Sequence, residues 1–139
     1  MDYTKLNDTY ILRIDRGEEI VKKLEEFCEN EDIKVGTIEG LGAVDRAEIG
    51  LFVTGEKEYH STVLTGDHEI TSLKGNITRK DGEVYLHLHI NLSDESYNTR
   101  GGHLNSATVS GTCEVFVREV NGNIGRKFDE KVGLNLFDF

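Results

Sequence analysis

The sequence predicts an α+β fold: a mostly antiparallel sheet of about seven strands, with one main helix at about residues 17–30 packed on it. Three observations carry this prediction. The length of 139 residues is typical of one compact domain. Apolar and polar residues alternate along most of the chain, as in half-buried strands, and only one segment follows a helical period. Because no repeat, low-complexity tract or linker divides the chain, we expect a single domain over residues 1–139.

The first half of the chain is predicted to hold a strand at 10–14, the helix, and further strands at 47–53 and 58–64. Between the helix and 47–53, the segment 32–44 is predicted to form a short strand and a glycine-rich turn at 40–44. Asp15 and Glu18 have the spacing of a capping box, with acidic residues in the first helical turn. The apolar stripe of the helix consists of Ile20, Val21, Leu24, Phe27 and Cys28.

The second half is predicted to begin with a hairpin over 69–92 that turns at Asp81-Gly82, a dipeptide that tolerates positive φ. The polar stretch 93–102 is interpreted as the longest irregular loop, either functional or a mobile connector. A strand at 107–120 then turns at Asn121-Gly122 into a short strand near 124–129, and a last strand at 133–137 ends the fold.

Composition limits the partners. The net charge is −10, from 16 basic and 26 acidic residues, and no basic patch is visible, so we expect no direct binding to DNA. No apolar run approaches the roughly 18 residues of a membrane span, and the N-terminus lacks the features of a signal peptide. These features predict a cytoplasmic protein that does not enter membranes. Cys28 and Cys113 lie among apolar neighbours outside any Cys-x-x-Cys pair, which favours buried, reduced thiols.

Three histidines form the most distinctive pattern. In "VYLHLHINL", His87 and His89 leave the same face of a strand, roughly 6.6 Å apart along the chain. His103 follows in "RGGHL", and an antiparallel pairing of 84–92 with 106–118 would return it near the end of the first strand, with Gly101 and Gly102 allowing close approach. Such a set is typical of a catalytic-type zinc site with one open position. By spacing alone, the commoner alternative is a His-x-His pair whose rings hydrogen-bond water or are satisfied within the core.

Other residues give weaker signals. His60 and His68 have no partner at ligand spacing and are expected at the surface. Glu114 lies on the polar face of the adjacent strand but is no obvious fourth ligand. Arg100 and Arg126 are candidates for anion binding, with surface charge as the alternative for each. The chain has no Gly-x-Ser-x-Gly motif, and its glycines at 40–44 lack the spacing of a phosphate or dinucleotide loop.

Several segments in order resemble one family, the PPC (plant and prokaryote conserved) domain, over about residues 8–137. They are "LRIDRGEEIVKKLEEFC", "GLGAVDRAEIGLF", "EITSLKGNI", "VYLHLHINLSD", "GGHLNSATVSGTCEVFV" and "IGRKFDEKVGLNLF". The resemblance implies a homotrimer and a metal, zinc first, on His87, His89 and His103. It also implies a fold similar to that of acetolactate decarboxylase, a likeness of fold that carries no activity. Plant members bind AT-rich DNA through an AT-hook, which needs a Gly-Arg-Pro core. This chain has no proline, so it has no AT-hook.

Three hypotheses follow. The first is a stand-alone, homotrimeric metal-binding module whose small-molecule ligand is unknown. The second is a metal-dependent enzyme acting on a small anionic substrate, with Arg100 or Arg126 holding a carboxylate. The third is the DNA-associated regulator that the family's usual label suggests. We favour the first, and whether the protein is catalytic is left open.

Overall fold

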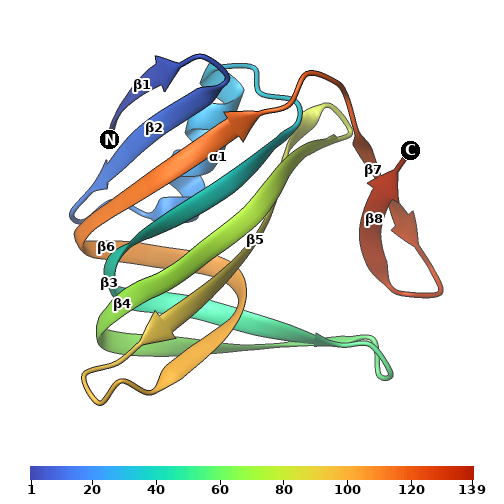
Figure 1. The fold of residues 1–139 in the computed structure, drawn as a ribbon. Coiled ribbons are helices and arrows are strands. Elements are labelled where there is room, and N and C mark those ends of the chain that lie inside the picture. The colour runs from blue at the N-terminus through green and yellow to red at the C-terminus, as the bar shows by residue number, and fades with distance from the viewer.

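The computed structural model describes residues 1–139 as eight strands and one helix (Figure 1). The α+β class and the single helix are confirmed, and the number of strands is eight where the sequence predicted about seven. In chain order the elements are β1 (Asp2–Leu6), β2 (Thr9–Asp15), α1 (Ile20–Asn30), β3 (Gly36–Val53), β4 (Glu58–Lys80), β5 (Glu83–Ser93), β6 (Thr99–Glu119), β7 (Gly125–Asp129) and β8 (Leu134–Asp138).

Six strands form one antiparallel sheet in the order β1-β2-β6-β3-β4-β5. The sheet curls until its last strand, β5, also pairs with the beginning of β6. Three strands make this curvature possible because they are 18 to 23 residues long and change partners along their length. The register of β3 shifts between Gly40 and Gly42 and again between Val44 and Arg46, and such bulges bend a strand and increase its twist.

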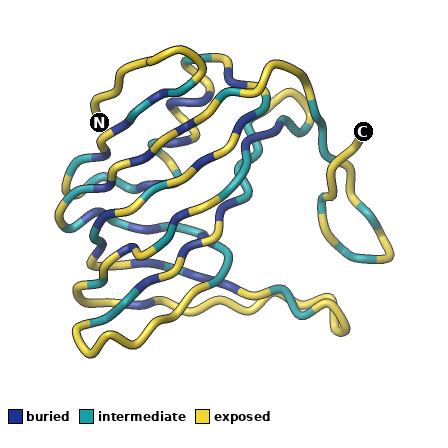
Figure 2. Tube along the Cα trace, viewed as in Figure 1, coloured by how far each residue is buried: buried dark blue, intermediate teal, exposed yellow.

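The core lies between the curled sheet and α1. Buried positions alternate with exposed ones along the strands, which is the pattern expected for a sheet with one covered face (Figure 2). The helix turns four side chains into this core, Ile20, Leu24, Phe27 and Cys28. Cys28 and Cys113 are both buried and unpaired, and burial raises the pKa of each thiol to about 12. The expectation of buried, reduced thiols is therefore confirmed.

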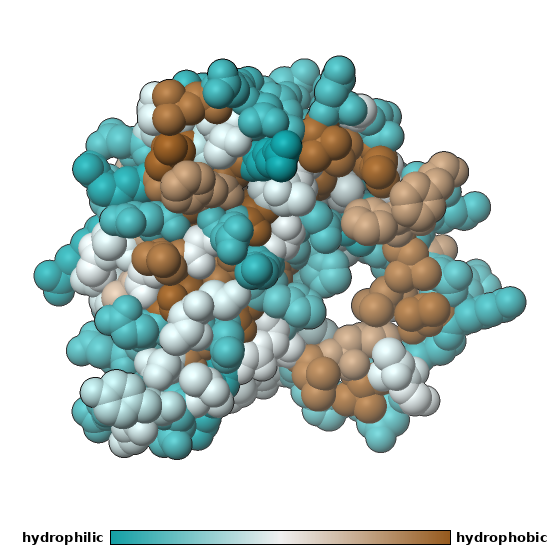
Figure 3. Space-filling model, viewed as in Figure 1, coloured by the Kyte–Doolittle hydropathy of each residue, from teal (hydrophilic) through white to brown (hydrophobic).

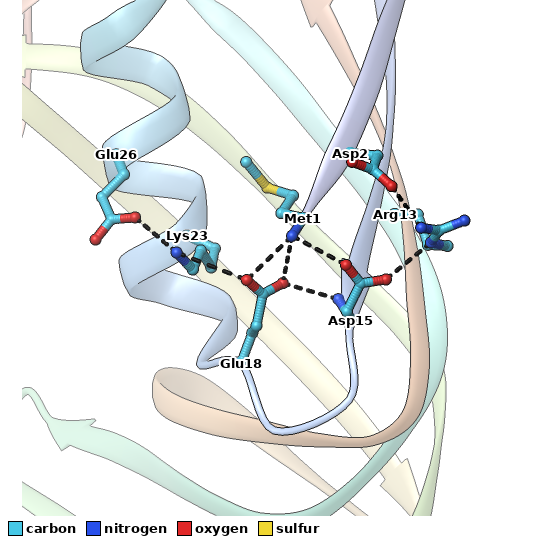
Figure 4. Close-up of polar contacts among 7 residues, drawn as sticks. All are labelled: Met1, Asp2, Arg13, Asp15, Glu18, Lys23 and Glu26. Atoms are coloured by element: carbon cyan, nitrogen blue, oxygen red, sulfur yellow. Dashed lines mark hydrogen bonds and ion pairs between the residues drawn. The ribbon is translucent and has the colours of Figure 1, made fainter.

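The helix does not begin with the predicted capping box. Its N-cap is Glu19, whose carboxylate accepts hydrogen bonds from the backbone N–H groups of Val21 and Lys22. Glu18 instead accepts from the Asp15 backbone N–H and contacts the Met1 ammonium (Figure 4). The sequence analysis had placed the acidic residues inside the first helical turn, but in the structure they precede it. There they connect the helix to the N-terminal strands.

The predicted turn at 40–44 is wrong, because these residues continue β3. β6 passes so close that a Cβ on Gly40 would lie 2.9 Å from the Glu114 carbonyl oxygen, and one on Gly42 would lie 2.2 Å from that of Thr112. The glycines therefore serve a close approach of two backbones. In the same way the predicted strand at 58–64 and the first strand of the predicted hairpin join into the single strand β4.

The last two strands form a separate hairpin that stands beside the main sheet (Figure 1). The predicted turn at Asn121-Gly122 leads the chain away from β6, since β7 pairs only with β8. Several hydrogen bonds join the hairpin to the body: Arg126 donates to Thr78 and Asn76 on β4, and Lys57 donates to the Glu130 carbonyl. No helix of the structure is long and apolar enough to cross a bilayer.

Candidate metal centre

The structure brings His87, His89 and His103 together. β5 carries His87 and His89 on one face, and His103 on β6 lies directly opposite His89 in the ladder that closes the sheet. The ring centroids are 5.0 Å apart for His87 and His89, 5.4 Å for His87 and His103, and 5.8 Å for His89 and His103. One nitrogen from each ring lies within 4.8 Å of the others.

A tight return of the chain produces this arrangement. Only residues 94–98 form the connection, in which the Asp94 carboxylate accepts from the backbone N–H groups of Ser96 and Asn98. The predicted irregular loop at 93–102 is therefore too long at both ends. The segment opposite β5 is 99–103, whereas the predicted partner 106–118 pairs with β3 and β2.

Two glycines make the closure sterically feasible, as the sequence suggested. A Cβ on Gly101 would lie 2.7 Å from the Ile90 carbonyl oxygen, and one on Gly102 would lie 2.5 Å from that of Gly50. Any larger residue would push β6 away from β5 or β3 at the level of His103. The predicted role of these glycines in close approach is confirmed.

The surroundings of His87 and His103 favour the neutral imidazole at these two positions. Burial, followed by the neighbouring His89, His103 and Arg126, lowers the pKa of His87 to about 4. Burial and then His89 lower the pKa of His103 as well. His87 and His103 are half-buried and His89 is exposed. Unprotonated rings keep a lone pair free, which is the state that binds a metal ion.

The histidines open into a cavity of about 450 Å³. Its walls come from β5, from the β3–β4 hairpin and from the β7–β8 hairpin, and the opening between the body and the last hairpin is visible on the right of Figure 3. Apart from the histidines and Arg126, the lining is largely apolar or aromatic, with Leu51, Phe52, Tyr59, Tyr85, Leu134 and Leu136 as its large side chains. Pockets with a few polar groups on an apolar wall are typical of small-molecule sites.

The other candidate residues divide between this cavity and the rest of the surface. Arg126 lines the cavity, whereas Arg100 lines a different hollow together with His68 and Asp94. Glu114 is exposed near the far end of β6, opposite Leu41, and is absent from the cavity wall.

The two remaining histidines lie outside the centre. His60 is exposed, as expected, and joins Glu56 and Glu58 in a second group of close donor atoms. All three residues of that group are exposed, and such acidic groups are common without an ion. His68 is half-buried, with its ring nitrogen 2.7 Å from the Gly66 carbonyl oxygen.

Sequence reasoning missed Tyr59, which packs edge-on against His103 at a centroid distance of 6.1 Å. Its hydroxyl donates to the Asn105 side chain at 2.6 Å, which fixes the ring beside the centre. The ring lies across Gly50, where a Cβ would be 2.0 Å from the Tyr59 hydroxyl oxygen. The alternation of 58–64 showed which face Tyr59 occupies, but no local signal showed what lies opposite.

This donor set suits a transition metal. Three imidazoles on rigid strands, with no carboxylate among the cavity residues, match the three protein ligands of an open zinc site. The fourth position would face the cavity, where a small molecule can enter. The arrangement can therefore hold an ion and present it to a ligand.

Comparison with known proteins decides the family. The model of the Plants and Prokaryotes Conserved (PCC) domain matches residues 1–121. The chain belongs to the PCC-domain family. This is the family that the sequence segments resemble, and the match ends before the β7–β8 hairpin, although the resemblance was expected to reach about residue 137. No curated relative matches the chain.

Solved structures agree with this assignment. A candidate DNA-binding protein from Bacteroides thetaiotaomicron is 36% identical, with a TM-score of 0.97 over 99% of this chain and 96% of that one. A metal-containing protein from Archaeoglobus fulgidus is 37% identical, with a TM-score of 0.90 over 100% and 99% of the two chains. A Staphylococcus aureus protein similar to α-acetolactate decarboxylase is 11% identical, with a TM-score of 0.57 over 85% and 54%. This last likeness is one of fold alone, as the sequence had suggested.

Proposed function

We propose that this PCC-domain protein is a metal-binding module that holds one divalent transition metal ion, zinc first, on His87, His89 and His103. The observation that carries the proposal is the convergence of three ring nitrogens within 4.8 Å of one another, from two strands whose pairing is enforced by glycines. The metal-containing relative from Archaeoglobus fulgidus, 37% identical over the whole chain, supports it.

The residues of the chain define what the centre can do. His87, His89 and His103 would hold the ion, and the largely apolar wall would limit water around the remaining position. Zinc at such a position supplies Lewis acidity to a bound carbonyl or water. Arg126 on the same wall favours a second candidate function, an enzyme acting on a small anionic substrate. The binding module is preferred because no acidic residue that could serve as a general base lines the cavity.

We also propose a homotrimer as the assembly, as the family resemblance implies. Leu41 on β3 and Phe116 on β6 support an interface on the sheet, since they line one surface hollow and are 58% and 52% exposed. Sedimentation analysis of the purified protein tests this assembly. A mass of three chains is expected, and a monomer at micromolar concentration would contradict it.

The metal proposal is tested by elemental analysis of the purified protein and of a His87→Ala, His89→Ala double variant. The wild type is expected to carry about one ion per chain and the double variant none. A matched control is His60→Ala, His68→Ala, which removes two histidines outside the centre and should keep the ion. A wild type without stoichiometric metal, or a centre variant that retains it, would refute the proposal.

Direct DNA binding is not part of the proposed function. The name of the Bacteroides thetaiotaomicron relative points toward DNA, but this chain carries a net charge of −10. A phosphate backbone is bound mainly through clustered Lys and Arg side chains, and binding weakens steeply with salt. We therefore propose that any role near DNA passes through a partner.

A further inference from the structure

Arg126, at the start of the β7–β8 hairpin, is held almost rigidly. Its Nε donates to Thr78 at 2.9 Å, one terminal nitrogen donates to the Asn135 carbonyl at 2.9 Å, and the other donates to the Asn76 side chain at 2.7 Å. The guanidinium also stacks on two rings, with centroid distances of 4.6 Å for Tyr85 and 4.5 Å for Phe137. Such a group is preorganised, so a ligand that binds it loses little side-chain entropy.

Arg126 has no counter-ion. The chain contains 26 acidic residues, yet Arg126 forms no ion pair, and Asn and Thr side chains with a carbonyl take the places where carboxylates would be expected. The contrast is Arg79, a comparably packed arginine that pairs with Glu29 at 2.7 Å. A guanidinium has five N–H groups, and only three of those on Arg126 have protein acceptors, so about two remain for a ligand.

The unpaired cation faces the metal centre. Asn76, which accepts from Arg126, is the cross-strand partner of His87, so the two side chains leave adjacent positions on one face of the sheet. Arg126, His87 and the other two histidines line the same cavity. On its other side Arg126 borders a polar hollow whose cations, Lys34 and Arg79, already pair with Asp32. An anion is therefore favoured on the histidine side.

We propose that Arg126 is the anchor for a small organic monocarboxylate that occupies this cavity. The carboxylate accepts from the free N–H groups of Arg126, and the apolar body of the ligand packs against Leu51, Phe52, Leu134 and Leu136. This inference rests on the proposed function, since it names the ligand class of the same site. Two free N–H groups suit one carboxylate, whereas a phosphate dianion would find no second Lys or Arg on this wall. Arg100 has no part in the site, because it lines another hollow.

The experiment uses isothermal titration calorimetry of zinc-loaded protein with benzoate, its neutral isostere benzamide, and inorganic phosphate. Benzoate is expected to bind at least about tenfold more tightly than benzamide or phosphate. Arg126→Lys is expected to weaken benzoate binding at least about tenfold, because an ammonium cannot reproduce the planar, bidentate contact. The matched control Arg100→Lys should bind benzoate like the wild type.

A second measurement avoids dependence on the variant's folding. The Nε–H resonance of Arg126 in the wild type should shift on addition of benzoate and stay unchanged with benzamide. Equal binding of the acid and the amide, tighter binding of phosphate, or an unshifted Arg126 resonance would overturn the proposal. The metal content of every sample is measured separately by elemental analysis. A wild-type protein that cannot hold zinc but still binds benzoate through Arg126 would refute the proposed metal-binding function and support Arg126 as the carboxylate anchor.

Discussion

If zinc binds as proposed, removing His87 should abolish most of the stabilisation that the ion is expected to give the protein. An ion that binds only the folded state stabilises it by about 2.7 kcal/mol when its free concentration is about 100 times the dissociation constant. Unfolding entropy of about 2.1 cal/mol/K per residue gives about 0.3 kcal/mol per degree for a chain of 139 residues. Zinc at that concentration should therefore raise the melting temperature of the wild type by about 9 °C.

The size of the loss in His87→Ala follows from the donor set. Four-ligand zinc sites bind with about 10–16 kcal/mol, so one protein ligand is worth roughly 3 kcal/mol, or about a hundredfold in affinity. At the zinc concentration used for the wild type, the variant's stabilisation falls to about 0.4 kcal/mol and its shift to about 1–2 °C. The His87 ring makes no hydrogen bond to protein, which makes its removal a clean test of the ion.

The assay is thermal unfolding followed by circular dichroism, with and without zinc, on protein first stripped with a chelator. His60→Ala is the control, because His60 belongs to the exposed group with Glu56 and Glu58. If the His60→Ala protein lost the zinc-dependent shift in melting temperature, the ion would be assigned to that exposed group. A His87→Ala protein that keeps the full 9 °C or so would refute the assignment of His87 as a ligand.

Three further predictions concern stability and partners. Arg79→Ala should lower the free energy of unfolding by about 3 kcal/mol in urea titrations, because the guanidinium donates to the Cys28 and Ile33 carbonyls and pairs with Glu29. A loss below about 1 kcal/mol would contradict this role. Arg79 holds the pKa of Glu29 below its ordinary value of 4.5, so the pair stabilises the fold above about that pH and its contribution is lost as the pH falls further. The stability difference between wild type and Glu29→Gln should accordingly shrink from pH 6 to pH 3. Since Glu29 is half exposed, this difference should stay below about 1 kcal/mol. A difference that does not change with pH would argue against a stabilising role of the Glu29 charge. In filter-binding assays near 0.15 M salt, duplex DNA should not be retained, and tight retention would overturn the argument from charge.

Local features were readable from the sequence. The alternation in β5 placed His87 and His89 on one face, and that is where the structure has them. Asp81 and Gly82 adopt φ values of 54° and 90°, as the predicted turn requires. Both features depend on residues within one strand or turn, so neighbours in the sequence are sufficient to specify them.

Features set by distant residues were missed. The helix begins at Ile20 because the Glu19 carboxylate caps its first turn and also accepts from the Ala107 backbone N–H, 88 positions away, at 2.9 Å. Gly40 and Gly42 looked like a turn because only the close passage of β6 explains them as strand residues. Arg126 was named from the sequence as a candidate for anion binding, but together with Arg100. No local pattern shows that Arg126 alone reaches the cavity, on a hairpin outside the main sheet.

The candidate centre depends on the sheet curling back on itself. β5 alone supplies two imidazoles, which by spacing are an ordinary exposed pair, and it is the pairing of 89–93 with 99–103 that adds the third. β6 then continues from this ladder into its pairings with β3 and β2, so the same strand that completes the set of histidines also spans the core. A ligand set built on such a strand is held by the packing of the whole domain and needs no metal to order it. That rigidity, together with an arginine that has no counter-ion at the cavity wall, favours a preformed ligand-binding site over a purely structural metal site that only stabilises the fold.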